Sequence, residues 1–429
     1  MKVLNLVSRY KNGNLNSFAI ISTLSVANAV FPFLLLPILT NELEQSEFGM
    51  LVIMEAFLAL LAPLIHCSLG GLLVEYYRLE KEDFKSYLFN TLLLALPFFL
   101  LAMLITNIFA EFFVDIFGAN RGWLLILPIL CFINVVNQIT VVLFQCQKKY
   151  GLFGLFLLGP NLLTFIITLI LLNNTGLGWE SKLYAMLGVA SVYSMFSIYI
   201  VLRESDKHRF LNLATVKSNL AYTMPLLPHT LMAALYFMSD RLILSNMLGA
   251  EAVAIYASGL QLALIMSVLQ NSLSKAWSPF VIKYLSKTSD ENQLCPVALK
   301  KMRKYMFLAC FFVVLAALFV SVSIWYLVDI LLPPQYQEAK YTGVILVIGF
   351  MFLGFYKIFS PILWYFKKTS QLSKVTTVVF VLNIVFNLMF IPQFGIIGAS
   401  ISTLSCLFLQ FALTQMYIEQ TLKSNLVKA

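Results

Sequence analysis

Apolar runs about as long as a membrane is thick follow one another along almost the whole of this chain. Each contains roughly 20 or more residues, enough for a helix to cross a hydrocarbon core of about 30 Å. Overall, 60% of the residues are hydrophobic and 11% are charged, whereas about a quarter of the residues of a soluble domain are charged. The sequence therefore predicts an all-α integral membrane protein that crosses the bilayer many times.

Charged residues and breaks rich in Gly, Pro or Asn divide these runs into about twelve predicted spans. Their approximate limits are 16–40, 47–74, 87–109, 122–145, 151–172, 179–202, 218–247, 251–282, 304–328, 341–366, 373–391 and 395–421. The first span is too long, and too soon followed by another, to be a cleaved signal peptide.

Positive charge is distributed unevenly over the connections between these spans. Most of the 29 Lys and Arg residues lie in one set of alternating connections, and the other set holds only Arg121, Lys182 and Lys340. Because cations in short loops favour the cytoplasm, we expect both the N and C termini to be cytoplasmic. The net charge of +9 then reflects topology, and we expect no nucleic-acid partner.

Enzyme and metal-site patterns are missing from the sequence. The six cysteines show no CxxC spacing and the three histidines lie in unrelated segments, whereas a zinc site needs about three or four convergent ligands. There is no GxxxxGK[ST] loop for a nucleotide, and no loop has room for a catalytic domain. We therefore expect no enzymatic activity, no metal and no cofactor, and a function carried out within the bilayer.

Weak internal repeats divide the chain into halves. A shift of 205 residues places "ILTNEL" (38–43) over "ILSNML" (243–248), and a shift of 219 places Lys148-Lys149 over Lys367-Lys368. With six spans in each half, the halves have the same orientation, as in transporters with parallel repeats. We predict two six-helix bundles, residues 1–210 and 211–429, that work by alternating access.

Five charged residues, together with His66 and His229, are the candidate ionisable groups embedded in the predicted spans, where charge is costly and usually serves a pathway. The cations are Lys357, Arg241 and Lys275, and the carboxylates are Asp240 and Glu55. Lys357 lies about 15 Å along its helix from the next loop, near the middle of the bilayer. The alternatives are structural: a lysine paired with a carboxylate or carbonyls, a helix-to-helix ion pair for Asp240 or Arg241, and a buried ion pair instead of proton coupling for Glu55.

Amides in two spans add milder polarity. Asn134, Asn137 and Gln138 lie in the fourth span, and Asn383 and Asn387 are four residues apart in the eleventh. They are candidates to line a wet cavity, although hydrogen bonds between helices are the commoner use of such residues in lipid.

Three motifs resemble those of a known family. They are "LPILTNELEQSEFGML", "LGGLLVEYYR" and "SDRLILSNMLGAEAVAIYASGLQL", the last containing Asp240, Arg241, Gly249 and Tyr256. With twelve spans in two halves, the chain resembles the polysaccharide flippases of the O-antigen translocase (Wzx) type. These belong to the multidrug/oligosaccharidyl-lipid/polysaccharide exporter superfamily, so the resemblance implies a MATE-like fold.

The resemblance also implies a substrate. Wzx-like proteins move an undecaprenyl-pyrophosphate-linked oligosaccharide, a repeat unit of O-antigen (lipopolysaccharide) or capsule, from the cytoplasmic to the periplasmic leaflet of the bacterial inner membrane. Cations on the cavity wall would offset part of the desolvation of the pyrophosphate, a role expected for Lys357, Arg241 and Lys275. Membrane lipid, a polysaccharide polymerase and a chain-length regulator are the implied partners.

Two other functions remain open at this point. A cation-coupled multidrug exporter of the same superfamily is expected to favour acidic cavity residues, whereas the embedded charges here are three cations and two carboxylates. A membrane-embedded polysaccharide polymerase or ligase is expected to carry a sizeable basic external loop, and the predicted external loops are short.

Overall fold

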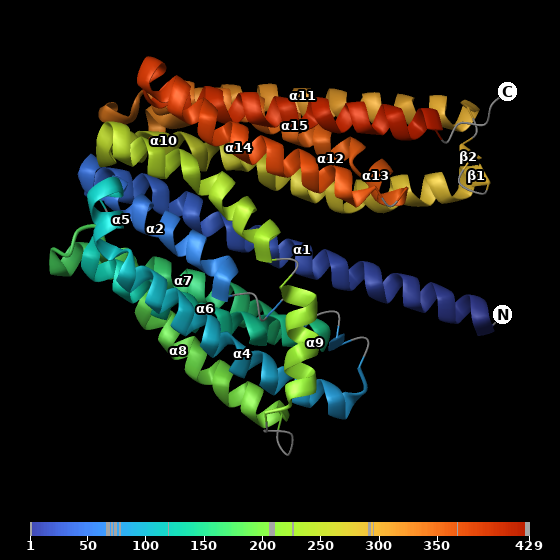
Figure 1. Ribbon diagram of the computed structural model, residues 1–429, viewed down its shortest axis with the longest axis horizontal. Coiled ribbons are helices and arrows are strands. Elements are labelled where there is room, and N and C mark those ends of the chain that lie inside the picture. The colour runs from blue at the N-terminus through green and yellow to red at the C-terminus, as the bar shows by residue number, and fades with distance from the viewer. Residues whose placement is uncertain are drawn as a thin grey trace. The chain divides into compact units, whose positions relative to one another are not determined.

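The computed structural model is almost entirely helical (Figure 1). It describes residues 2–65, 69, 72, 75–76, 79–118, 120–205, 211–224, 227–290, 293–294, 296–366 and 368–424. Within these residues, 11 helical segments are long and apolar enough to span a membrane. The chain is a multi-pass membrane protein.

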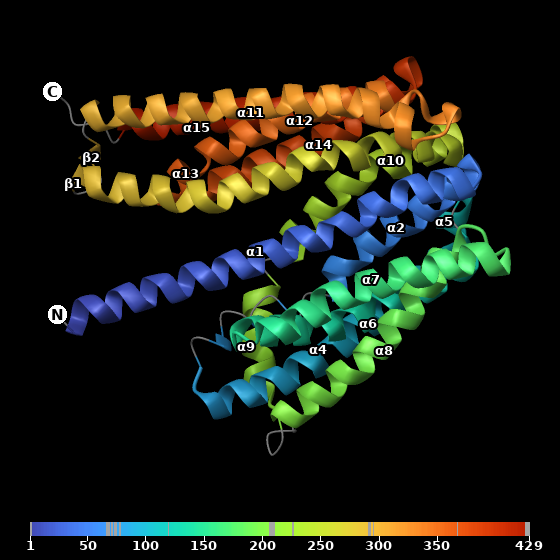
Figure 2. The same ribbon diagram turned by 180° about the vertical axis from the view of Figure 1, so that it is seen from behind.

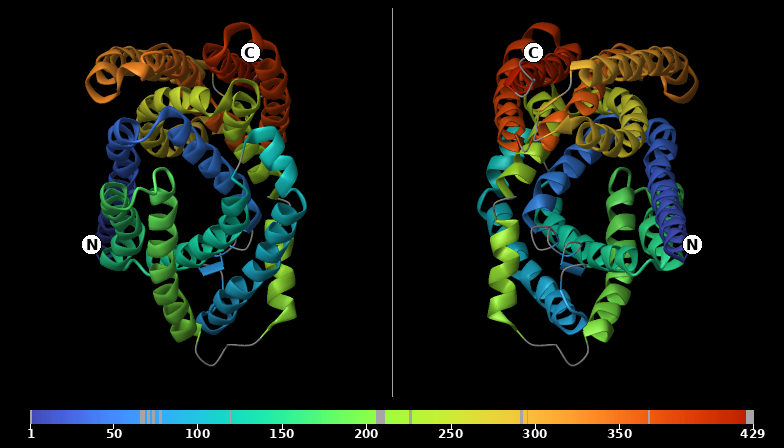
Figure 3. Two further views of the ribbon diagram at one scale, coloured as in Figure 1. Left: turned by 90° about the vertical axis from the view of Figure 1, so that its left-hand side faces the viewer. Right: turned by 90° about the vertical axis from the view of Figure 1, so that its right-hand side faces the viewer.

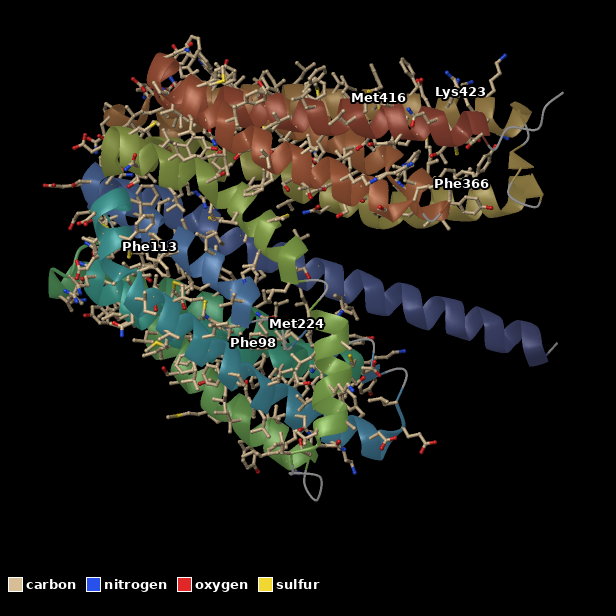
Figure 4. The ribbon with its side chains drawn as sticks, in the orientation of Figure 1. Phe98, Phe113, Met224, Phe366, Met416 and Lys423 are labelled. Carbon is tan, nitrogen blue, oxygen red and sulfur yellow. The ribbon has the colours of Figure 1, made fainter. Side chains whose placement is uncertain are left out.

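The chain forms two compact units, Met1–Ala234 and Leu235–Ala429. The division lies later than the predicted boundary at residue 210, because the short helix α9 (Leu213–Thr223) packs on α4 (Lys81–Ile108) of the first unit. Leu94 and Phe98 of α4 contact Val216 and Leu220 of α9. Figure 4 labels Phe98 on α4 and Met224 just after α9.

The first unit is arranged around one central helix, α6. Its long helices are α1 (Lys2–Glu42), α2 (Gln45–Ile65), α4, α6 (Arg121–Cys146), α7 (Tyr150–Thr175) and α8 (Glu180–Ser205), with a short α5 (Ala110–Phe117). Helix α6 packs against α2, α4, α7 and α8. It is buried along most of its length, which is why the apolar character of the fourth predicted span extends to all its faces.

The ends of these helices have local causes. The Asn120 side chain accepts a hydrogen bond from the backbone N–H of Trp123 and caps α6. Gly118 and Gly176 follow α5 and α7 with φ of 62°, the left-handed conformation that glycine adopts most easily. Polar capping and glycine stops explain why the predicted limits of these spans fall within a few residues of the observed ones.

The second unit contains the rest of α10 (Leu227–Thr288), α11 (Pro296–Leu331), α12 (Ala339–Phe359), α13 (Pro361–Tyr365), α14 (Thr369–Phe394) and α15 (Ile396–Ser424). A two-residue pair of strands, β1 (Ser289–Asp290) and β2 (Gln293–Leu294), joins α10 to α11, and the 3-10 turn η3 (Pro334–Tyr336) precedes α12. Helix α12 packs on α11 and α15, and α14 packs on α15. Figure 2 shows α11 beside α12, and Figure 3 views these helices nearly end-on.

Helix α10 folds back on itself at Gly249 (Figure 1). Gly249 has φ 84° and ψ 178°, a region essentially reserved for glycine. The Tyr256 hydroxyl lies 2.6 Å from Asp240 Oδ2 although 16 residues separate them, whereas a straight helix would place them about 24 Å apart. We call the part before Gly249 the first arm and the part after it the second arm.

This reversal explains the number of candidate spans. The predicted spans 218–247 and 251–282 meet at Gly249, but the continuous candidate segment runs Met238–Asn271 through that residue. The count of eleven candidate segments for the described residues therefore takes these two predicted spans as one. The seventh predicted span, 218–247, also differs from the structure at its start, because α9 ends at Thr223 and α10 begins at Leu227.

Candidate functional site

Asp240 lies deep inside the second unit, near the middle of the first arm of α10, and only 4% of its surface is exposed. Its Oδ2 accepts hydrogen bonds from the hydroxyls of Tyr256 and Thr403, each at 2.6 Å. Its Oδ1 accepts from the amide nitrogens of Asn387 at 2.6 Å and Asn383 at 3.2 Å. One carboxylate is thus held by four uncharged donors from the second arm of α10, α14 and α15.

A second layer fixes these donors. Ser239 Oγ donates to Asn383 Oδ1 at 2.5 Å, and Asn387 Nδ2 also lies 3.3 Å from that oxygen. Both asparagines are fully buried. Asn387 Oδ1 is buried without a hydrogen-bond partner in the described part of the chain. We call Ser239, Asp240, Tyr256, Asn383, Asn387 and Thr403 the Asp240 cluster.

The chemistry of this cluster suits a small cation. A buried carboxylate normally has a basic partner, because an isolated ion in a low-dielectric interior is costly, yet the four donors to Asp240 are neutral. Hydroxyl groups rotate, and amide groups can present either oxygen or nitrogen. The cluster can therefore turn several oxygens toward one small monovalent cation.

Arg241 follows Asp240 in the chain but has different neighbours. Its Nη1 lies 2.9 Å from Met238 Sδ, and its Nε is buried without a hydrogen-bond partner among the described residues. Adjacent helical residues point in different directions, so the two charges do not share a partner in these contacts.

Lys357, on α12, donates from Nζ to Asn271 Oδ1 of the second α10 arm at 2.8 Å. Trp277 Nε1 donates to the backbone oxygen of Ile358 at 2.8 Å. The Trp277 side chain lines a small pocket together with Lys357 and Gln270. Gln270 is 3% exposed, and its Oε1 lacks a hydrogen-bond partner within the described residues. The ammonium group therefore lies in a half-buried site with a neutral amide as its partner.

The three predicted pyrophosphate ligands do not meet at one point. Arg241 lies about 12 Å before Gly249 along the first arm, whereas Asn271, the partner of Lys357, lies about 33 Å after it along the second. Because the arms run antiparallel, Arg241 and Lys357 are about 20 Å apart along the unit. Lys357 is thus nearer the end of the helices away from Gly249 than the midplane position expected from the sequence. Lys275 is one turn beyond Asn271, and its side chain lies outside the described residues.

Glu55 is paired with Lys182. Its Oε1 lies 2.5 Å from Lys182 Nζ, joining α2 to the start of α8. The other two predicted external cations are also paired, Arg121 with Glu111 at 2.8 Å and Lys340 with Asp329 at 2.5 Å. The geometry favours the structural alternative for Glu55.

The amides of the fourth predicted span have separate surroundings. Asn137 is buried, donates to the Phe156 backbone oxygen at 3.3 Å and accepts from Ser197 at 3.4 Å, so it joins α6 to α7 and α8. Asn134 and Gln138 remain partly exposed, one helical turn apart, and are the better candidates to line a cavity.

Sequence reasoning missed three of the side chains that complete these sites. Tyr256 was part of the recognised motif without an assigned role. Thr403 and Asn271 are ordinary polar residues in apolar helices. The only sequence signal for them is that a polar group in a span needs a partner.

The two units of membrane-spanning helices, with a buried carboxylate held by neutral donors in the second, are those of a multi-pass membrane protein. Solved structures of similar fold include the inward-closed lipid II flippase MurJ, at a TM-score of 0.65 and 13% identity over 92% of this chain and 87% of that one. An inward-facing multidrug resistance MATE transporter of the MOP superfamily gives a TM-score of 0.70 and 14% identity over 92% of this chain and 99% of that one. The fold is that of the MOP superfamily.

The sequence profile described as "Polysaccharide biosynthesis protein" matches residues 15–285, and the chain belongs to this family of Wzx-type flippases. It is also 24% identical over 387 residues to "Lsg locus putative protein 1" of Haemophilus influenzae, covering 87% of this chain and 92% of that protein. It is therefore a flippase-like transporter of polysaccharide biosynthesis and not an enzyme.

Proposed function

We propose that the protein flips an undecaprenyl-pyrophosphate-linked oligosaccharide, a repeat unit of O-antigen or capsule, from the cytoplasmic to the periplasmic leaflet of a bacterial inner membrane. The two units alternate access to the substrate between the two sides. The family supports the substrate class, and the similarity to a lipid II flippase supports the lipid-linked form.

The observation that carries the proposal is the surroundings of Lys357. Lys357 is half-buried in an apolar helix, and its ammonium group donates an exposed hydrogen bond to the neutral oxygen of Asn271. A pyrophosphate entering this site gains a charge-assisted interaction and displaces only an amide. Lys275, one turn beyond Asn271, is the second proposed pyrophosphate ligand.

Arg241 has a different place in this proposal. At about 20 Å from Lys357 along the unit, it does not bind the same phosphates in the conformation described. We assign it to a later position of the substrate on the path. Asn134 and Gln138 are proposed to line the wall of the cavity in the first unit.

The experiment compares Lys357→Ala with wild type for flipping of the lipid-linked oligosaccharide in reconstituted vesicles. We expect a loss of about 10- to 100-fold, the factor corresponding to one charged hydrogen bond, with partial activity in Lys357→Arg. The matched control is Lys340→Ala, because Lys340 is engaged by Asp329 and Trp325. Full flipping by a well-expressed Lys357→Ala variant would remove Lys357 as a ligand.

A deletion strain distinguishes the proposed flippase from a multidrug exporter of the same superfamily. Loss of surface polysaccharide with lipid-linked units retained on the cytoplasmic side supports the flippase. Normal polysaccharide with raised drug sensitivity instead supports the multidrug exporter.

A further inference from the structure

A cavity of about 440 Å³ lies within the first unit, whereas Lys357 and Asp240 belong to the second. It is formed where the start of α4, the end of α6 and the end of α8 come together with the segment before α4. Its lining residues are Tyr76, Leu79, Phe84, Lys85, Leu88, Leu143, Gln147 and Glu204. The connections at these helix ends belong to the Lys- and Arg-rich set predicted to be cytoplasmic.

The cavity has an apolar floor and a polar wall. Phe84, Leu88 and Leu143 belong to a buried cluster that also contains Tyr87. The Tyr76 ring packs edge-on against Phe84, with ring centroids 4.9 Å apart. One side of a ligand would therefore meet carbon and aromatic surface.

The polar wall carries two acceptors that the described residues leave poorly satisfied. Gln147 Oε1 is buried without a hydrogen-bond partner within the described residues, and such an atom is costly unless a ligand or water supplies a donor. Glu204 adds a carboxylate whose Oε1 lies 3.7 Å from Lys149 Nζ, a long ion pair. Lys85 is the one cation among the described lining residues.

The phenol of Tyr76 is a dependable donor in this setting. Burial, with smaller contributions from Cys146 and Glu204, raises the pKa of Tyr76 above its usual value of 10. The group therefore stays protonated at physiological pH.

The mixture of donors and acceptors in this cavity favours a sugar over a phosphate. A phosphate is surrounded by donors in its sites, and a carboxylate together with an unpartnered carbonyl would repel it. A sugar ring donates and accepts through its hydroxyls, and its C–H face packs on aromatic carbon. The volume also lies within the roughly 300–1,000 Å³ usual for small-ligand sites.

We propose that this cavity binds a sugar residue of the lipid-linked oligosaccharide, with Gln147 and Glu204 accepting hydrogen bonds from its hydroxyls and Tyr76 donating one. The inference rests on the proposed function and adds a glycan subsite to it, in the unit that lacks Lys357.

The test uses the full-length protein in a detergent without a sugar headgroup, and as a probe the organism's own repeat-unit oligosaccharide released from its lipid. Calorimetric titration of wild type is expected to show binding. Gln147→Met, which removes the acceptor at nearly constant volume, is expected to weaken binding roughly fivefold, and Glu204→Gln roughly tenfold. Leu79→Trp, which fills the cavity from its rim, is expected to abolish it.

Lys149→Gln is the matched control, because it breaks the ion pair to Glu204 without changing a lining residue. We expect it to bind the oligosaccharide as wild type does. Equal binding by wild type, Gln147→Met and Leu79→Trp, or no binding by wild type, would overturn the proposal. So would displacement of the oligosaccharide by glycerol phosphate.

Flipping by wild type, measured in the same preparation, separates the two proposals. If wild type flips the lipid-linked substrate while the cavity variants bind the free oligosaccharide normally, only the glycan subsite is wrong. If wild type does not flip it, the proposed function fails.

Discussion

Asp240 shows how one buried charge organises its surroundings. Four neutral donors from three other helical segments hold it, and no basic group among the described residues lies at hydrogen-bond distance, so it is the best candidate in the second unit to bind a small cation. We propose that binding of a proton or Na⁺ at the Asp240 cluster is coupled to transport.

Asp240→Asn tests this coupling. We expect the variant to lose the stimulation of flipping by an imposed Na⁺ or proton gradient, because a neutral amide cannot exchange charge with the ion. Flipping in vesicles with each gradient imposed separately identifies the ion. Asp329→Asn is the control, since Asp329 is half exposed and paired with Lys340. Gradient-dependent flipping by Asp240→Asn would exclude the cluster as the coupling site.

For single residues, the sequence predicts which polar side chains need hydrogen-bond partners but not which residues supply them. The spacing of Asn383 and Asn387 indicates a shared helix face, and the cost of a buried charge marks Asp240. Their meeting depends on the rotation and depth of helices more than 140 residues apart in the chain. The same applies to Lys357, whose neighbour Asn271 lies 86 residues away.

Among the elements, α10 contributes the most residues to the candidate sites. Its two arms hold Asp240, Tyr256 and Asn271, and their separation along the unit is set by the turn at Gly249. The sequence predicts the limits of this and most other helices well, because apolar length, capping residues and glycine stops are local signals. It also predicts the break between residues 247 and 251, where α10 reverses at Gly249.

Gly249→Ala is expected to destabilise the protein by about 1–3 kcal/mol, because a side chain does not readily adopt φ 84° with ψ 178°. No atom lies within 4 Å of the added Cβ, so the effect is one of backbone strain. Thermal unfolding in detergent measures it.

Gly188→Ala supplies the comparison. Gly188 is inside α8, and its added Cβ also has open space, so alanine is expected to be neutral or to stabilise by up to about 1 kcal/mol. Similar unfolding temperatures for the two variants would mean that Gly249 is not strained by a side chain.

For the whole molecule, the central expectation is its orientation in the membrane. The cavity of the first unit brings together the start of α4 and the ends of α6 and α8, so three connections of the cation-rich set do share one end of that unit. Charge distribution predicts that this end faces the cytoplasm.

Reporter fusions measure that orientation. Green fluorescent protein placed after Lys149 is expected to fluoresce, and alkaline phosphatase placed after Gly178 to be active, because the first folds inside the cell and the second outside. The reversed pattern would invert the topology and, with it, the proposed direction of transport.

The ion pairs of Arg121, Lys182 and Lys340 bear on how the substrate leaves. Each of these predicted external cations already has a carboxylate within 2.8 Å. On the proposed path, a pyrophosphate that reaches the predicted external side is attracted only weakly, because the cations there are already paired with carboxylates. The cation-rich side attracts it more strongly. In this proposal, the paired surface charges of the external side favour release of the substrate and disfavour its rebinding there.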